Sequence, residues 1–143
     1  MAKTSGLGGA ILVQDSGGTA RTITNDCTNY SFTTPRNTQD VTGVDKFAKE
    51  TLLLLADYTV TLNGVFNSAS TNLSHDVFKT IPSTTAIRSV EIDPLGATTG
   101  LPSLVVNNYL TDYQITRANT GELTWQVPGQ LADGNVPTWT THA

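Results

Sequence analysis

The stretch LLLLADYTVTLNGVFN, residues 52–67, is the most informative part of the chain for its fold. In its second half Tyr58, Val60 and Leu62 alternate with polar residues, a period of two that places apolar side chains on one face of a strand. The other face carries short, uncharged polar side chains. The pattern predicts one half-buried β-strand over this stretch and a β-rich core around it.

Similar patterns on both sides of this stretch predict further strands. We expect them over residues 10–14, 19–24, 86–93, 104–107, 110–117 and 122–127. Turn-forming residues at 15–18 and 118–121 join two of these pairs, which predicts two hairpins. One short helix is expected over 74–81, because Ser74 can cap its start and Pro82 can end it.

Two segments lack a sustained hydrophobic period. Residues 25–43 are rich in turn formers, which predicts a long loop or arm, and residues 129–143 are predicted to form an extended C-terminal tail. Between the first of these segments and the long strand, residues 45–50 are expected to form a helical turn. Aromatic side chains on mobile segments often anchor protein contacts, so the candidate inter-subunit residues are Tyr30, Phe32 and Trp139.

The length and composition indicate the class of protein. With 143 residues, the chain is expected to form a single domain over 1–143. Charged residues make up 14% of the chain, against about 25% in ordinary domains, and threonine, asparagine, serine and glycine take their place. This composition favours strands and turns. We therefore predict a mainly β fold, a two-sheet β-sandwich or rolled barrel with one short flanking α-helix.

Charge and apolar runs argue against several function classes. The formal net charge is −4, and the eight lysines and arginines form no run, so a basic face for duplex DNA is not expected. The longest apolar run is residues 52–56, far below the roughly 20 residues of a membrane-spanning helix. The N-terminus lacks the pattern of a secretory signal. Cys27 is the single cysteine, so no internal disulfide can form, and synthesis in a cytoplasm fits best.

Residues able to support catalysis or bind metal are few and scattered. His75 lies beside Ser74 and Asp76, but adjacent side chains do not converge as a catalytic triad requires. Cys27, His75 and His142 are far apart in sequence, which does not fit a zinc site. We expect no catalytic residue, no cofactor and no metal.

Acidic residues offer two further candidate pairs. Glu91 with Asp93, or Asp112 with Glu122, could be neighbours across strands and perform acid–base chemistry. Solvated strand faces are the simpler interpretation of both pairs.

Three segments, taken in order, carry a family resemblance. They are DVTGVDKFAKETLLLLADYTVTLNGVFN at 40–67, SHDVFKTI at 74–81 and YLTDYQITRANTGELTWQVPG at 109–129. Together they resemble the tail tube (major tail) proteins of siphophages. The resemblance covers most of the chain and follows a plan of elements more than a signature motif.

The resemblance implies a structural virion protein and no enzyme. Six copies would form a ring, and stacked rings would form a hollow conduit through which DNA passes without specific binding. Other tail proteins, such as the tape measure and the terminator, would be partners of a chain made in the host cytoplasm. The candidate lumen-facing residues are Glu91, Asp112 and Glu122, because an acidic lining would keep phosphates from sticking.

Two other readings share this composition. A head decoration or tail completion protein would also be β-rich and poor in charge. A β-sandwich carbohydrate-binding module would use Trp125, Trp139 or tyrosines as stacking platforms. Trp125 alternates with core residues, which argues against its exposure.

Overall fold

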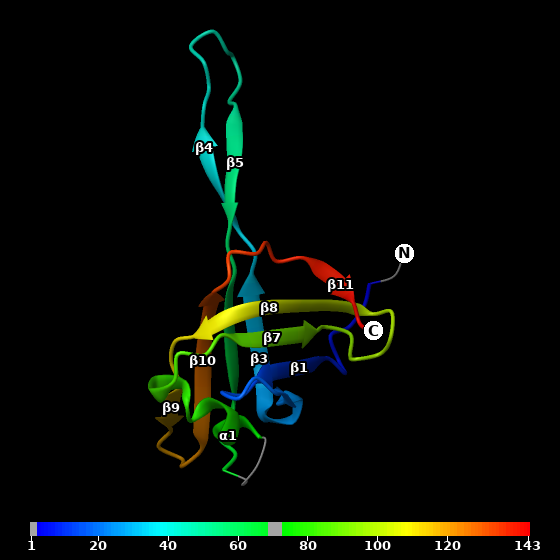
Figure 1. The fold of residues 1–143 in the computed structure, drawn as a ribbon, viewed down its shortest axis with the longest axis vertical. Coiled ribbons are helices and arrows are strands. Elements are labelled where there is room, and N and C mark those ends of the chain that lie inside the picture. The colour runs from blue at the N-terminus through cyan, green and yellow to red at the C-terminus, as the bar shows by residue number, and fades with distance from the viewer. Residues whose placement is uncertain (1–2, 69–72) are drawn as a thin grey trace.

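The computed structural model, shown in Figure 1, describes residues 3–68 and 73–143 and is mainly β. The strands are β1 (Ala10–Gln14), β2 (Ala20–Thr22), β3 (Cys27–Thr33), β4 (Arg36–Asp40), β5 (Thr51–Ala56), β6 (Thr59–Val65), β7 (Arg88–Asp93), β8 (Pro102–Leu110), β9 (Gln114–Arg117), β10 (Leu123–Leu131) and β11 (Trp139–Thr141). The helical segments are α1 (Ser74–Phe78) and two 3₁₀ turns, Thr24–Asp26 and Ile81–Ser83.

The strands of the body form one antiparallel sheet folded into two layers. Its order is β2-β1-β7-β8-β10-β6-β3, with β11 also paired to β8 and β9 to β10. In Figure 1 the strands β1, β7 and β8 run across β10, β6 and β3, and α1 lies at the lower end. The predicted mainly β sandwich with a short flanking helix is confirmed.

The core consists of alternate side chains from both layers. One layer supplies Val13, Val90, Ile92, Leu104 and Val106, and the other supplies Tyr58, Val60, Leu62, Trp125 and Val127. All of them are buried. The period of two in the sequence therefore identified the correct inner face of β6 and of Trp125 and Val127 in β10, whereas Leu123, expected to face inward, is exposed.

The strand predicted over residues 52–67 is in fact two strands, β5 and β6. Asp57 separates them: its N–H donates to the Pro35 carbonyl at 2.9 Å, and its Oδ1 accepts the Tyr58 N–H at 2.7 Å. The predicted hairpins β1–β2 and β9–β10 are both present. Of these strands, β1 has the predicted bounds.

The prediction of a long loop over residues 25–43 is wrong, because this span contains all of β3 and all of β4. β3 has alternate exposed polar residues, and β4, with the sequence RNTQD, is exposed along its whole length. A strand that buries little side-chain surface needs no hydrophobic period, so the pattern that identifies strands is missing. The helical turn expected at 45–50 is also absent, since these residues lie in the turn region between β4 and β5.

The predicted C-terminal tail is likewise partly strand. β10 continues through Pro128 to Leu131, and β11 pairs with β8. Along one edge β10 pairs with β9 before Pro128 and with β8 after it. The Pro128 carbonyl faces this edge, where it accepts the Thr111 N–H at 3.1 Å. The missing proline N–H thus falls where the strand changes partner, and no ladder bond is lost.

The predicted helix is shorter than expected, because Ile81 and Pro82 belong to a 3₁₀ turn instead. Val77 and Phe78 are buried as the pattern requires. The Asp26 carboxylate accepts the Ser74 N–H at 3.2 Å, so the helix start is capped from a distant segment. Among the described residues, no helix is long and apolar enough to cross a membrane.

Candidate functional site

The most prominent feature is a hairpin that projects from the body, residues 34–57, which we call the arm. In Figure 1 β4 and β5 extend upward as a continuation of β3 and β6. The pairing passes from Thr33 opposite Thr59 in the body to Arg36 opposite Ala56 in the arm. The arm is thus the outer half of a long two-stranded ribbon.

Apolar side chains cover the arm without burial. Its four consecutive leucines, Leu52, Leu53, Leu54 and Leu55, are 52%, 60%, 44% and 78% exposed. Successive side chains of a strand point to opposite faces, so leucines lie on both faces of the arm, although the pairing with β4 is irregular opposite Leu54 and Leu55. Val44 and Phe47 near the tip are fully exposed. Exposed apolar surface gathered on one element marks an interaction site.

The tip of the arm is held by its own hydrogen bonds. Val41 N–H donates to the Glu50 carbonyl at 3.0 Å, and Glu50 N–H donates to Thr42 Oγ1 at 2.8 Å. The Thr42 hydroxyl and N–H both donate to Asp40, which lowers the pKa of that carboxyl. A hairpin ordered in this way loses less entropy on binding than a free loop would.

The structure gathers the three predicted inter-subunit aromatics into one cluster around Phe32. The Phe32 ring lies 6.3 Å from Tyr30, 6.0 Å from the buried Tyr58 and 5.9 Å from Trp139. Trp139 is 48% exposed. These side chains therefore attach β3 and β11 to the body within one chain, and their role in contacts between chains stays a prediction.

The three candidate lumen residues lie on different elements. Glu91 is on β7, Asp112 is exposed between β8 and β9, and Glu122 is exposed before β10. Asp112, expected on a strand, lies outside one. Glu122 accepts the Thr120 hydroxyl at 2.8 Å. Their orientation toward a lumen stays a prediction.

Glu91 differs from the other two acidic residues in its surroundings. It lies close to Asp93, and its Oε2 is 3.8 Å from His142 Nε2. Burial, followed by the neighbouring Asp93 carboxylate, raises the pKa of Glu91, while His142 acts in the opposite direction.

The other histidine is part of an aromatic cluster. His75 Nδ1 is 3.2 Å from the Tyr113 hydroxyl, and the His75 ring lies 4.9 Å from the Phe66 ring. Its sequence neighbours have other roles, since Ser74 is fully buried and Asp76 forms an ion pair with Lys79 at 2.8 Å. The arrangement is not that of a nucleophile activated by a base.

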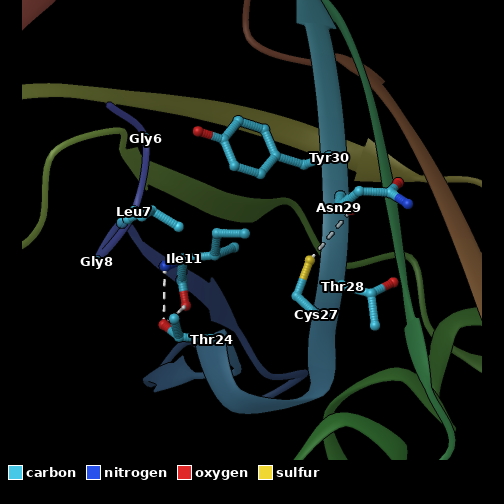
Figure 2. Close-up of a pocket in the computed structure, with 10 residues that line it drawn as sticks. Gly6, Leu7, Gly8, Ile11, Thr24, Cys27, Thr28, Asn29 and Tyr30 are labelled. Carbon is cyan, nitrogen blue, oxygen red and sulfur yellow. Dashed lines mark hydrogen bonds between the residues drawn. The ribbon is translucent and has the colours of Figure 1, made fainter. Parts of the chain in front are cut away.

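A hollow of about 440 Å³ lies between the N-terminal segment and β3. Figure 2 shows its lining, which comprises Gly6, Leu7, Gly8, Gly9, Ile11, Thr24, Cys27, Thr28, Asn29 and Tyr30. None of these lining side chains carries a full charge at neutral pH. Burial raises the pKa of the Cys27 thiol, whose Sγ lies 3.3 Å from the Asn29 carbonyl oxygen. The thiol is therefore protonated at neutral pH and is a poor nucleophile.

Sequence reasoning placed the four leucines of the arm in one half-buried strand over residues 52–67 and noted that their apolar run is too short for a membrane. A usable signal was present, because residues 52–55 do not alternate whereas residues 58–62 do. A strand that is apolar on both faces needs cover on both faces. Within the described residues that cover is missing, and the four leucines stay exposed.

Comparisons of sequence find no match among family models or curated proteins. Comparison of structure does find likenesses. A chain from the tail of an empty gene transfer agent particle, solved with C6 symmetry, has a TM-score of 0.70 at 15% identity, over 94% of this chain and 95% of that one. A chain from the virion of a native gene transfer agent particle also scores 0.70 at 15% identity, over 92% and 95%.

A third likeness is to a chain from the six-fold symmetrised baseplate of the anti-feeding prophage. Its TM-score is 0.64 at 10% identity, over 99% of this chain and 96% of that one. All three likenesses extend over nearly the whole of both chains. The protein therefore shares its complete fold with components of these particles.

Proposed function

We propose that the chain is a structural virion protein, a tail tube subunit that assembles into hexameric rings stacked as a hollow conduit for DNA. The fold it shares with a chain from a C6-symmetric tail supports this assignment. So does the resemblance of its sequence to siphophage tail tube proteins.

The observation that carries the proposal is the arm. It projects beyond the body and exposes leucines on both faces, so it is built to contact a surface outside its own chain. In a ring of identical subunits each copy meets a different surface of the next, and every arm finds the same receiving surface. Such contacts would also cover the terminal strands of the sheet, β2 and β3.

The remaining parts of the proposal follow from assembly into a tail. The acidic residues Glu91, Asp112 and Glu122 would face the lumen and repel the phosphate backbone of passing DNA. The tape measure and the terminator would be further partners. The protein would be made in the host cytoplasm and function in the virion tail.

Electron microscopy of the purified, untagged protein tests the proposal. We expect tubes of regular diameter with six-fold symmetry. A variant in which Leu53 and Leu55 become serine should remain folded by circular dichroism but form no tubes. The matched control replaces Val105 and Ile115 with threonine, two exposed apolar residues of the body, and should still assemble.

A ring at the end of a tail is a second candidate, favoured by the likeness to a baseplate chain. It predicts discrete rings under the same conditions, and no tubes. A carbohydrate-binding module would be monomeric at all concentrations in gel filtration, a result that would contradict both tail assignments. Trp125 is 2% exposed and cannot serve such a module as a stacking platform.

A further inference from the structure

Three side chains from distant parts of the sequence meet on the outer face of the sheet. Val90 and Ile92 of β7 face the core, so Glu91 and Asp93 lie on the opposite face. His142, just after β11, reaches the same place. One possible ligand atom from each of Glu91, Asp93 and His142 lies within 4.8 Å of the others.

Asp93 is the unusual member of this cluster. Its side chain is fully buried, and no N–H or hydroxyl group of the described residues donates to either carboxylate oxygen. Its one hydrogen-bonding neighbour is the Glu91 carboxyl group, which can bond to it only by sharing a proton. No lysine or arginine in the described ranges forms a salt bridge with it. A buried carboxylate without a partner is costly, and the adjacent Glu91 carboxylate adds repulsion. The site therefore requires a positive charge or a shared proton between the two carboxyl groups.

His142 is oriented to supply a neutral nitrogen to the same point. Its Nδ1 lies 3.0 Å from the Ala143 oxygen, which can only accept, so the proton is assigned to Nδ1. The lone pair of Nε2 is then free on the side of Glu91 Oε2, 3.8 Å away. The backbone is fixed as well, since His142 N–H donates to Leu101 at 2.8 Å and Gly100 N–H donates to His142 at 2.9 Å. A second hydrogen bond of this kind orients histidines that bind metals.

We propose that this cluster binds a divalent transition-metal cation, with Glu91, Asp93 and His142 as its three protein ligands. Metal–ligand bonds of about 2.0–2.2 Å allow donors to be at most about 4.4 Å apart, so small side-chain rotations close the site. One imidazole with two carboxylates suits Zn²⁺ or Mn²⁺, whereas Ca²⁺ and Mg²⁺ prefer oxygen alone. Water would complete the coordination.

The bound cation would connect the C-terminal segment to the sheet. β11 pairs with β8, while Glu91 and Asp93 belong to β7 on the other edge of β8. A metal would thus cross-link β7 to the residue that follows β11. This role concerns the single chain and does not depend on its assembly. It would replace the DNA-repelling role of Glu91, because the cation neutralises its charge, and would leave Asp112 and Glu122 as the lumen candidates. Sequence spacing concealed the cluster, because His142 is remote from Asp93 in the chain.

Calorimetric titration of the untagged, metal-free chain with Zn²⁺ tests the proposal. We expect one ion per chain and a rise in the unfolding temperature of about 5–10 °C at a Zn²⁺ concentration a hundred times the Kd. His142→Ala and Glu91→Gln should each weaken binding at least tenfold. His75→Ala, which removes the other histidine, should bind as the wild type does. Co²⁺ should give a visible absorption band in the wild type that is lost in His142→Ala.

Hydrogen exchange provides a second readout, since Zn²⁺ should slow exchange in β11 of the wild type and not of His142→Ala. Absence of Zn²⁺ binding, or equal binding by His142→Ala, would overturn the proposal. If Zn²⁺ has no effect while Glu91→Gln raises the unfolding temperature, the two carboxyl groups share a proton instead. The test does not require Asp93→Asn. A folding defect caused by replacing this buried residue would therefore not affect the conclusion about Zn²⁺ binding.

Discussion

The body and the arm are built from the same kinds of residue and use them in opposite ways. In β6 the apolar residues alternate and are buried, as with Leu62 at 0% exposure. In β5, just before it on the same ribbon, four leucines follow one another and all are exposed. Alternating apolar and polar residues fit a strand with one face in solvent, whereas a continuous apolar run is typical of a strand that is buried on both faces. The body buries its apolar side chains within one chain, and the arm leaves its own exposed.

Paired substitutions in the two regions test this difference, and the largest effect is expected for leucine. Leu62→Ala in the body should lower the free energy of unfolding by about 2–5 kcal/mol, because it leaves a cavity in the core. Leu53→Ala in the arm should change it by less than about 0.5 kcal/mol. Chemical denaturation of unassembled protein measures both. Tube formation, measured below the unfolding temperature of Leu62→Ala, should be affected in the opposite order. Leu53→Ala should impair it more than Leu62→Ala does.

A glycine pair is expected to give the next largest effect. A Cβ on Gly64 would lie 2.1 Å from the Asp26 carbonyl oxygen and 2.4 Å from the Trp125 ring, so backbone or core must shift. Gly64→Ala should cost about 1–3 kcal/mol or more. At Gly43 in the arm the nearest contact is the flexible Asp45 carboxylate at 2.9 Å, which can move away. Gly43→Ala should unfold at nearly the same denaturant concentration as the wild type. An equal loss of unfolding free energy in Gly64→Ala and Gly43→Ala would contradict the difference between body and arm.

The same contrast shows which parts of the fold could be predicted from sequence. The inner face of β6 and the helix region were predicted correctly, because each buries one side and so carries a period. The two hairpins were predicted from the turn-forming residues that join their strands, although β2 and β9 bury little. β3 and β4 were missed since they bury little, and the end of β10 was missed because Pro128 concealed a change of partner. The arm was expected in the right region, but as a loop. Clusters such as Glu91 with His142 depend on tertiary pairing and leave no local pattern.

An arginine pair is expected to give a smaller difference. Arg88 is 2% exposed and donates to the Val77 carbonyl in the last turn of α1 and to Thr80 Oγ1 at 2.7 Å. Arg88→Met should cost about 1–3 kcal/mol, because the buried Val77 carbonyl loses its donor. Arg36 in the arm donates to the Leu54 carbonyl at 2.8 Å but is exposed, so water can replace it. Arg36→Met should therefore lie within about 0.5 kcal/mol of the wild type in denaturant titrations.

The smallest effect is expected for an aspartate pair at acid pH. Burial, the largest single influence, raises the pKa of Asp15, but the Thr19 and Gly17 N–H groups and Arg21 together lower it below its ordinary 3.8. A carboxyl with a lowered folded pKa stabilises the fold above its unfolded pKa, and this contribution is lost as the pH falls through the folded value.

Asp15→Asn should therefore flatten the acid side of the stability curve by less than about 1 kcal/mol, since the Asp15–Arg21 pair is partly solvated. The pKa of Asp40 in the arm is lowered too, through Thr42. Because the arm lies outside the cooperative core, Asp40→Asn should leave the unfolding of the body unchanged across the same pH range. Thermal unfolding at a series of pH values compares the two variants. An equal flattening in Asp40→Asn would mean that the arm unfolds together with the body, and that the two regions are not independent.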